Sequence, residues 1–409
     1  MVYRLLYVGT VLDPKFQRVG GEPTVARDLI DYLQASFEVH TLFDNFLARN
    51  FTPIKRLTSG FRTFGFKVDV NRRVYNYYIK VINRINPDII LSQYDYDTTI
   101  IEAANTLNKK IIVYTHIYWP ICPKLTLLNQ KGVCNGFLGN NCYSCTLRDY
   151  TGLNKLAIKL LSNKNSLNVK MNNRVSHLNY PNVTIIALNK RMMNLFVNNG
   201  IDENSIKVIE NGIDLTLFNH SNVKKEQAIC YLGGLNNLKG YRTFLEIAEY
   251  LHARYESVRI YATGEYNNRI KRKYQYITFT GLLNKGDLVK LLQKCKVLVF
   301  PSIWMEPSSA VPIEAAAVGT VTVGSQLSNL EAIIEHGVTG YIIDGSDSIS
   351  SYFRYIEQLL FDEHLFNEFS TKLIARTRKF ANRNVTYENI TNLIGTIINK
   401  DSKSSNQCI

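Results

Sequence analysis

The sequence predicts an α/β protein of two domains, each with a parallel sheet at its centre. Its 409 residues are enough for two separate hydrophobic cores. In both halves, short apolar runs alternate with glycine-bearing loops and amphipathic segments, as expected for strand–loop–helix units. We place the first domain at residues 1–217 and the second at 218–384. Residues 385–409 are expected to form a helix that returns to the first domain, followed by a disordered polar tail, KDSKSSNQCI.

The bulk composition restricts the class of protein and its partners. Apolar residues make up 45% and charged residues 20% of the chain, which is typical of globular proteins. A net charge of +14 favours an anionic partner such as a nucleotide or a phospholipid surface. We expect no nucleic-acid partner, because no binding motif accompanies the charge. No apolar run is long enough to predict a transmembrane helix, and residues 1–10 predict a strand rather than a signal peptide.

Residues 299–331 contain the pattern around which the second domain is organised. An apolar strand over Val297–Phe300 leads into a loop, and an alanine-rich helix follows from about Ser309 to Gly319. Glu306 lies in the loop and Glu314 in the helix, with seven residues between them. A helix start suits a phosphate, whereas carboxylates suit the hydroxyl groups of a sugar or ribose. Taken alone, such a pair also fits an ordinary solvated helix face.

The run E-P-(x)6-E-A-A-A-x-G-T-V-T-V, followed by EHGVTGYII, resembles the signature of retaining glycosyltransferases of family 4, in the glycogen synthase and mannosyltransferase-like group 1. The resemblance to this family extends from about Ile206 to Ile343. This resemblance implies the GT-B fold, in which two Rossmann-like domains face each other across a cleft. It also implies transfer with retention and no cofactor for catalysis. Inverting GT-B enzymes and sugar-nucleotide epimerases share the fold, but the Glu pair argues against them.

A glycine loop near the N-terminus is the first candidate site in the first domain. Gly20, Gly21 and Glu22 lie between an apolar strand and an amphipathic helix. The two glycines allow the backbone to approach a ligand closely. In the resembled family this loop faces the inter-domain cleft on the acceptor side, although an ordinary turn fits the sequence as well.

His116 is the second candidate of the first domain. It ends the strand KKIIVYT and precedes IYWPICP, a run similar to the family pattern H-D-x-W-x-x-C-P. Ile117 replaces the family's Asp, so no His–Asp pair is expected. The resemblance implies that the imidazole contacts the transferred sugar or the acceptor, whereas a lone histidine is more often structural.

Four cysteines lie within a predicted insertion at about residues 117–150. Cys122, Cys134, Cys142 and Cys145 occur within 24 residues. In a chain without a secretion signal, such spacing favours a structural zinc or iron–sulfur site over disulfides or free thiols. All three alternatives stay open at this point.

Two basic segments of the first domain suggest contact with an anionic membrane. Residues 54–84 carry eight Lys or Arg against one Asp, with aromatic residues between them. The same pattern also fits a helix that packs its aromatic side chains into the core. Residues 150–180 are basic and rich in Asn, and they could line the acceptor side or rest on a membrane.

In the second domain, AICYLGGLNNLKG is similar to the family's glycine loop with a diphosphate-binding Arg and Lys. Lys239 occupies the Lys position, where an ammonium would stabilise the leaving diphosphate. Gly234 occupies the Arg position, which leaves one clamp cation instead of two. Without this context, Lys239 would be taken for an exposed surface lysine.

The resemblance assigns roles to the candidate residues. Glu306, Lys239 and His116 are expected to be catalytic. Donor binding is expected from a larger set: Glu314, Ser309, Ala310, Gly233, Gly234, Gly264, Gly281 and Leu283.

The expected activity is transfer of a sugar from a UDP- or GDP-sugar to a glycan or lipid-linked glycan in glycan biosynthesis. We expect a cytoplasmic enzyme, peripheral on the cytoplasmic face of the membrane. A catalytically silent GT-B scaffold that binds sugar or membrane is the alternative. Gly234, Ile117 and the Ser308-Ser309 pair in place of the family's Phe-Gly favour that alternative.

Overall fold

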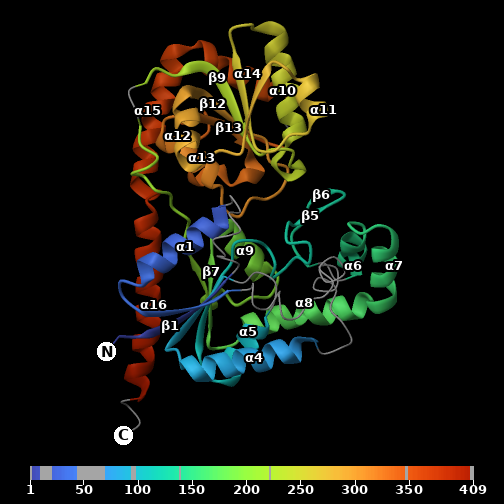
Figure 1. The fold of residues 1–409 in the computed structure, drawn as a ribbon, viewed down its shortest axis with the longest axis vertical. Helices are drawn as coiled ribbons and strands as arrows, with labels where there is room; N and C mark the ends of the chain where they lie inside the picture. The colour runs from blue at the N-terminus through green and yellow to red at the C-terminus, as the bar shows by residue number, and fades with distance from the viewer. Residues whose placement is uncertain are drawn as a thin grey trace. The chain divides into compact units, whose positions relative to one another are not determined.

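A computed structural model describes residues 2–9, 21–43, 70–93, 98–137, 140–220, 223–345 and 349–405. The chain divides into two compact units (Figure 1). The first unit comprises Met1–Glu210 with Tyr387–Ile409, and the second comprises Asn211–Thr386. Predicted site residue Gly20, residues 54–69 of the basic segment and the last four residues lie outside the described part.

The first unit is built on a six-stranded parallel sheet of order β2-β1-β3-β4-β7-β8. Its strands are β1 (Arg4–Gly9), β2 (Glu38–Phe43), β3 (Ile89–Ser92), β4 (Lys110–Tyr114), β7 (Val183–Ala187) and β8 (Ile206–Val208). Consecutive β1 residues Leu5, Leu6 and Tyr7 are fully buried. Because neighbouring side chains of a strand point to opposite faces, both faces of this sheet are covered.

Helices and a small hairpin complete the first unit. The helices are α1 (Gly21–Leu33), α4 (Val70–Ile85), α5 (Thr99–Thr106), α6 (Asn140–Leu147), α7 (Gly152–Leu161), α8 (Lys164–Leu178) and α9 (Lys190–Asn198). Short strands β5 (Leu128–Asn129) and β6 (Gly132–Val133) form the hairpin. In α4, the side chains of Tyr78, Val81 and Ile82 are buried. The described part of the predicted basic segment therefore packs one face into the core.

The second unit has its own six-stranded parallel sheet, of order β11-β10-β9-β12-β13-β14. Its strands are β9 (Glu226–Leu232), β10 (Arg259–Thr263), β11 (Ile277–Gly281), β12 (Cys295–Phe300), β13 (Val321–Ser325) and β14 (Tyr341–Ile343). Its helices are α10 (Tyr241–Arg254), α11 (Asn268–Lys273), α12 (Lys285–Lys294), α13 (Ala310–Ala317), α14 (Ile349–Phe361) and α15 (Glu363–Phe380). Strand β12 is buried along its whole length, and it includes the predicted apolar run Val297–Phe300.

The order of strands defines one switch point in each sheet. In the second sheet the chain moves from β9 outward to β11, then returns to the other side of β9 with β12. In the first sheet the same reversal occurs between β1 and β3. Open α/β sheets bind ligands at the carboxyl ends of the strands that flank such a point. The topology therefore directs attention to residues that follow β9 and β12, and to those that follow β1 and β3.

The C-terminal helix is longer than predicted. Helix α16 (Arg383–Ser405) begins in the second unit and continues through the first. The prediction of a disordered tail from residue 400 is therefore wrong for residues 400–405, which are helical. These residues lack proline and glycine, so the backbone continues the α16 hydrogen-bonding pattern at little cost. Across the described ranges, no helix combines the length and apolar character that a membrane span requires.

Candidate functional site

A buried carboxylate and a lysine meet at the switch point of the second sheet. Lys239 ends a 3₁₀ turn, Asn237–Lys239, that follows β9, and Glu306 lies in the loop after β12. Lys239 Nζ lies 2.8 Å from Glu306 Oε1 and 2.9 Å from Oε2. The Glu306 side chain is 2% exposed and the Lys239 side chain 30%. The structure thus brings together two predicted catalytic residues that are far apart in the sequence.

Two further side chains hold Glu306, and the sequence analysis did not identify either of them. Trp304 Nε1 donates to Glu306 Oε1 at 2.8 Å, and Ser302 Oγ lies 2.7 Å from the same oxygen. Ser302 Oγ is also 2.9 Å from the carbonyl oxygen of Leu238, but a charged carboxylate is the stronger acceptor. Oε1 is therefore surrounded by three donors, whereas Oε2 meets Lys239 alone among the described residues. Both residues lie in the SIWME run beside Glu306, which is the signal that could have identified them.

Four predicted glycines form the floor of this site at the ends of β9, β10 and β11. Gly234 adopts φ +56° and donates its N–H to the carbonyl oxygen of Thr263 at 3.0 Å. Gly264 donates to the carbonyl oxygen of Gly281 at 2.8 Å, and a Cβ at Gly264 would lie 2.8 Å from Gly234 Cα. A Cβ at Gly233 would lie 2.2 Å from the hydroxyl oxygen of Tyr231. The close contacts at Gly233 and Gly264 and the positive φ of Gly234 and Gly281 disfavour larger residues at these positions, so the loops present main chain rather than side chains.

Helix α13 begins beside the Glu306 loop, and three predicted donor-site residues, Ser309, Ala310 and Glu314, lie at its start or within it. Ser309 is the N-cap residue and Ala310 the first helical residue. The Ser309 hydroxyl donates to the carbonyl oxygen of Ser328 at 2.7 Å, so it fixes the loop instead of capping the helix. The N–H groups of the first turn therefore keep the electropositive character of a helix start.

Glu314 lies on α13, one turn into the helix. Burial raises the pKa of its carboxyl group to about 7, and the positive charge of Lys285 opposes this shift. The group therefore changes its charge near neutral pH. Leu283 lies in the loop before α12, where it is partly buried and packs against the core of the unit.

In the first unit, His116 follows β4 and contacts Gln93, which follows the neighbouring strand β3, and Tyr114 of β4 itself. Its Nε2 atom lies 2.9 Å from Gln93 Nε2, and the Tyr7 hydroxyl donates to Gln93 Oε1. The Tyr114 ring lies 4.4 Å from the imidazole, measured between centroids. Burial lowers the pKa of His116 to about 4. No local motif identifies Gln93 or Tyr7. Gln93 contacts His116, and Tyr7 contacts Gln93, only because β1, β3 and β4 are consecutive strands of the sheet.

The glycine-loop candidates of the first unit are only partly described. Gly21 is the first residue of α1, and Glu22 follows it in the same helix. The side chain of Glu22 and the whole of Gly20 lie outside the described residues.

The four clustered cysteines, Cys122, Cys134, Cys142 and Cys145, all lie within the described residues. In the part of the chain that the structure describes, Cys122, Cys134 and Cys145 are free thiols. Burial raises the pKa of Cys122 and of Cys145, and the nearby Cys134 contributes a smaller increase to both. Over the ranges that the structure covers, no group of three or more His, Cys, Asp or Glu side chains could hold a metal ion. The zinc or iron–sulfur site stays a prediction, which the metal content of the purified protein would test.

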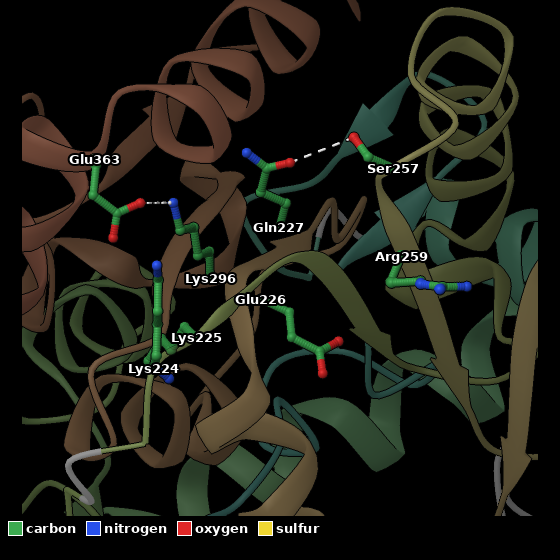
Figure 2. A pocket seen from close by; sticks show the side chains of 8 residues that line it. All are labelled: Lys224, Lys225, Glu226, Gln227, Ser257, Arg259, Lys296 and Glu363. Carbon is green, nitrogen blue, oxygen red and sulfur yellow. Dashed lines mark hydrogen bonds and ion pairs between the residues drawn. The ribbon is translucent and has the colours of Figure 1, made fainter.

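A hollow of the second unit lies at the opposite, amino end of its strands (Figure 2). Lys296 Nζ contacts Glu363 Oε2 at 2.6 Å, and the dashed line in Figure 2 marks this pair. Lys225 Nζ lies within 3.1 Å of three acceptors, on Leu292, Gln293 and Thr320. Two of the four cations that line this hollow, Lys225 and Lys296, bind acceptors of the protein. The hollow also lies at the amino ends of the strands, whereas open α/β sheets bind ligands at the carboxyl ends, so it is a poor candidate for the donor site.

A comparison with known proteins finds a family match within the second unit. Residues 214–380 match the family model described as glycosyl transferases group 1. The serotype-specific mannosyltransferase WbdA of Escherichia coli is 32% identical over 105 residues, which are 26% of this chain and 12% of that protein. The uncharacterized glycosyltransferase MJ1607 of Methanocaldococcus jannaschii is 29% identical over 159 residues, 34% of this chain and 40% of that protein. The chain therefore spans less than half the length of these relatives.

Solved structures resemble the whole chain. Sucrose-phosphate synthase from Thermosynechococcus elongatus has a TM-score of 0.66 and 15% identity, over 97% of this chain and 100% of that chain. Anabaena Alr3699/HepE in complex with UDP-glucose has a TM-score of 0.60 and 14% identity, over 96% and 100%. Identities this low show the fold alone, and they confirm the predicted fold class. The family match and the named relatives support the prediction of a glycosyltransferase, EC 2.4. This chain has the GT-B fold, and its residues 214–380 match the family model of the glycosyl transferases group 1.

Proposed function

We propose that the chain is a retaining family 4 glycosyltransferase that moves a sugar from a nucleotide-sugar donor to a glycan or lipid-linked glycan. The buried Glu306–Lys239 pair at the switch point of the second sheet carries this proposal. A buried charge is costly unless it is paired, so such a pair at a ligand-binding edge favours a functional role. The complexes of HepE with UDP and UDP-glucose support a UDP-sugar as the donor here.

The contacts of Glu306 and Lys239 suggest a separate role for each residue during sugar transfer. Glu306 Oε1 is occupied by three donors, so Oε2 is the oxygen with room for a sugar hydroxyl. Lys239 contacts both oxygens of Glu306 and would stabilise the negative charge that develops on the leaving diphosphate. The N–H groups at the start of α13 would bind the same diphosphate. Glu314 would accept hydrogen bonds from the ribose.

Acceptor activation needs no protein nucleophile in this scheme. The bond from the anomeric carbon to the diphosphate oxygen breaks, and the bond to the acceptor oxygen forms on the same face. The departing diphosphate takes the acceptor proton. Since Gly234 replaces a cation, Lys239 and the α13 N–H groups would carry the charge of the leaving group. A silent scaffold is the alternative that Gly234 favours.

Donor binding is the first test of this proposal. Thermal unfolding would be measured with UDP-, GDP- and ADP-sugars, because a ligand that binds only the native state raises the melting temperature. We expect one nucleotide sugar to stabilise the protein and the Glu314→Ala variant to lose that shift. A matched control is Glu246→Ala, which removes an exposed carboxylate from α10 of the same unit. Transfer or hydrolysis of the stabilising donor would then separate an enzyme from a scaffold.

Failure of this test has a defined meaning. If no nucleotide sugar shifts the melting temperature, the transferase proposal is wrong for these donors and the scaffold is favoured. An equal shift in wild type and Glu314→Ala would instead place the nucleotide away from α13.

We also propose that the first unit docks on an anionic membrane through α7, as a peripheral protein on the cytoplasmic face. Leu156 and Leu160 lie one turn apart on this helix and are 55% and 77% exposed. Ile158, on the other face, is buried. Residues 150–201 contain seven Lys or Arg and no Asp or Glu. Exposed leucines within an acid-free basic region are typical of helices that bind anionic lipid surfaces.

Vesicle sedimentation tests the membrane proposal. Wild-type protein is expected to bind vesicles that contain phosphatidylglycerol. It is not expected to bind vesicles made of phosphatidylcholine only. The double variant Leu156→Glu/Leu160→Glu should bind at least about tenfold less, because it places two charges at the apolar face. Val223→Glu changes an exposed apolar residue of the second unit and serves as control. Equal binding by all three proteins would refute a role for α7.

A further inference from the structure

Three neighbouring strands of the first sheet each place one polar side chain at their carboxyl ends. Tyr7 lies in β1, Gln93 directly follows β3, and His116 follows β4. The strands are in register, since Val8 pairs with Ser92 and Ser92 with Val113. Tyr7 is fully buried and Gln93 is 1% exposed. Sheet order and register therefore hold the three groups in one row.

The hydrogen bonds of this row have a direction. The Tyr7 hydroxyl donates to Gln93 Oε1, so the amide nitrogen of Gln93 faces the imidazole. Gln93 Nε2 lies 2.9 Å from His116 Nε2. An amide nitrogen can only donate, so His116 Nε2 must accept through its lone pair. The protonation of His116 is thus set by a tyrosine that does not touch it.

His116 is neutral under ordinary conditions. Burial lowers its pKa to about 4, so at neutral pH the ring carries one proton. With Nε2 as the acceptor, that proton lies on Nδ1. In free histidine the proton favours Nε2, so the protein inverts the usual preference.

We propose that Gln93 and Tyr7 are positioning residues that hold His116 as the tautomer protonated at Nδ1, and that His116 meets its substrate as a hydrogen-bond donor. The part of this inference that concerns the substrate of His116 rests on the proposed function. The group that it would recognise is an oxygen of a sugar, most simply a hydroxyl that accepts from Nδ1–H. His116 would then orient the sugar and would not act as a base.

The backbone around Tyr7 is shaped to keep this row intact. A Cβ at Gly9 would lie 2.6 Å from both Cε1 and the hydroxyl oxygen of Tyr7, closer than real contacts allow. Gly9→Ala would therefore displace the Tyr7 ring while Gln93 and His116 themselves are not mutated. The Tyr114 ring, 4.4 Å from the imidazole, limits rotation of His116 on its other side.

The tautomer can be observed directly by long-range ¹H–¹⁵N correlation of the histidine rings. The chain has seven histidines, and loss of one set of signals in His116→Gln assigns the ring. In wild-type protein at neutral pH we expect a protonated Nδ1 and an unprotonated Nε2. Gln93→Leu should shift His116 toward the Nε2-protonated tautomer, and Tyr7→Phe and Gly9→Ala should do so in part. Backbone amide spectra establish that each variant is folded.

Gln93→Glu makes the sharpest comparison, because it exchanges an amide for a carboxylate of the same shape. A carboxylate can only accept here, so it should reverse the tautomer and raise the pKa of His116. Transfer by Gln93→Glu should fall at least about tenfold in kcat/KM, with Tyr7→Phe intermediate. A merely structural role for Gln93 would lower stability and leave the tautomer as it was.

Two results would overturn the inference. One is an Nε2-protonated His116 in wild-type protein, which would mean that the Gln93 amide has the opposite orientation. The other is an Nδ1-protonated ring that persists in folded Gln93→Leu. The ring measurement needs no donor. An inactive wild type with the expected tautomer would therefore count against the proposed function and the sugar-binding role, but not against the control of His116 by Gln93.

Discussion

Replacing Glu306 with glutamine is expected to lower sugar transfer by about 10²–10³-fold and the free energy of unfolding by about 3 kcal/mol. Trp304 Nε1, Ser302 Oγ and Lys239 Nζ all converge on this carboxylate. The glutamine amide offers one acceptor oxygen, so its NH₂ group must face one of these donors. Lys239 would also lose the negative charge that holds it, at a site where the carboxylate is 2% exposed.

Both effects of Glu306→Gln can be separated by measurement. Urea unfolding gives the change in stability, and transfer measured well below the melting temperature gives the change in activity. The control is Glu246→Gln, which should alter stability by no more than about 0.5 kcal/mol, as exposed substitutions usually do. Wild-type stability and activity in Glu306→Gln would show that the pair is neither structural nor catalytic.

Replacing Glu314 with glutamine is expected to change how stability depends on pH, by up to about 3 kcal/mol between pH 4.5 and 8. The pKa of the carboxyl group is raised from 4.5 to about 7 by burial. The unfolded chain therefore releases this proton at lower pH than the folded chain. The stability that protonated Glu314 contributes is complete below pH 4.5 and is lost as the pH rises through 7. A glutamine has no proton to release, so its variant should escape this loss.

Unfolding in urea at pH 5 and pH 8 tests this expectation. Between pH 5 and pH 8, the free energy of unfolding should fall by up to about 3 kcal/mol more in the wild type than in Glu314→Gln. Donor binding should show the opposite trend in the wild type, because an ionised carboxylate is the better acceptor for ribose hydroxyls. Nucleotide sugars suit this experiment, since their diphosphate does not titrate near pH 7. Parallel stability curves for both proteins would mean that Glu314 titrates normally.

The sequence predicted the local elements of the second site closely. The strand expected at Val297–Phe300 is β12, Cys295–Phe300, and the helix expected at Ser309–Gly319 is α13, Ala310–Ala317. Both follow from patterns within a few residues: an unbroken apolar run, and alanines after a proline-bearing loop. The parallel, two-sheet architecture also followed from the repeated strand–loop–helix order.

The contacts that define the chemistry were not predictable in the same way. Lys239 and Glu306 were each expected in the site, but their direct pairing depends on β9 and β12 being adjacent. Gln93 directly follows β3 and belongs to no recognisable motif. Tyr7 lies within β1, whose apolar sequence predicts only a buried strand. Such partners are set by sheet order, which a single sequence does not encode locally. The length of α16 was missed because polar residues near a chain end resemble disorder.

Helix α16 also has a consequence for how the protein is made. It supplies Tyr387, Ile390 and Ile394 to the core of the first unit, and the Tyr387 ring lies 5.4 Å from that of Tyr32. The second unit, Asn211–Thr386, is continuous in sequence. On the ribosome, the unit that is synthesised first must therefore wait for the last helix before its core is closed. All residues of the second unit are synthesised before α16 is complete, so we expect this unit to be able to close its core before the first unit does.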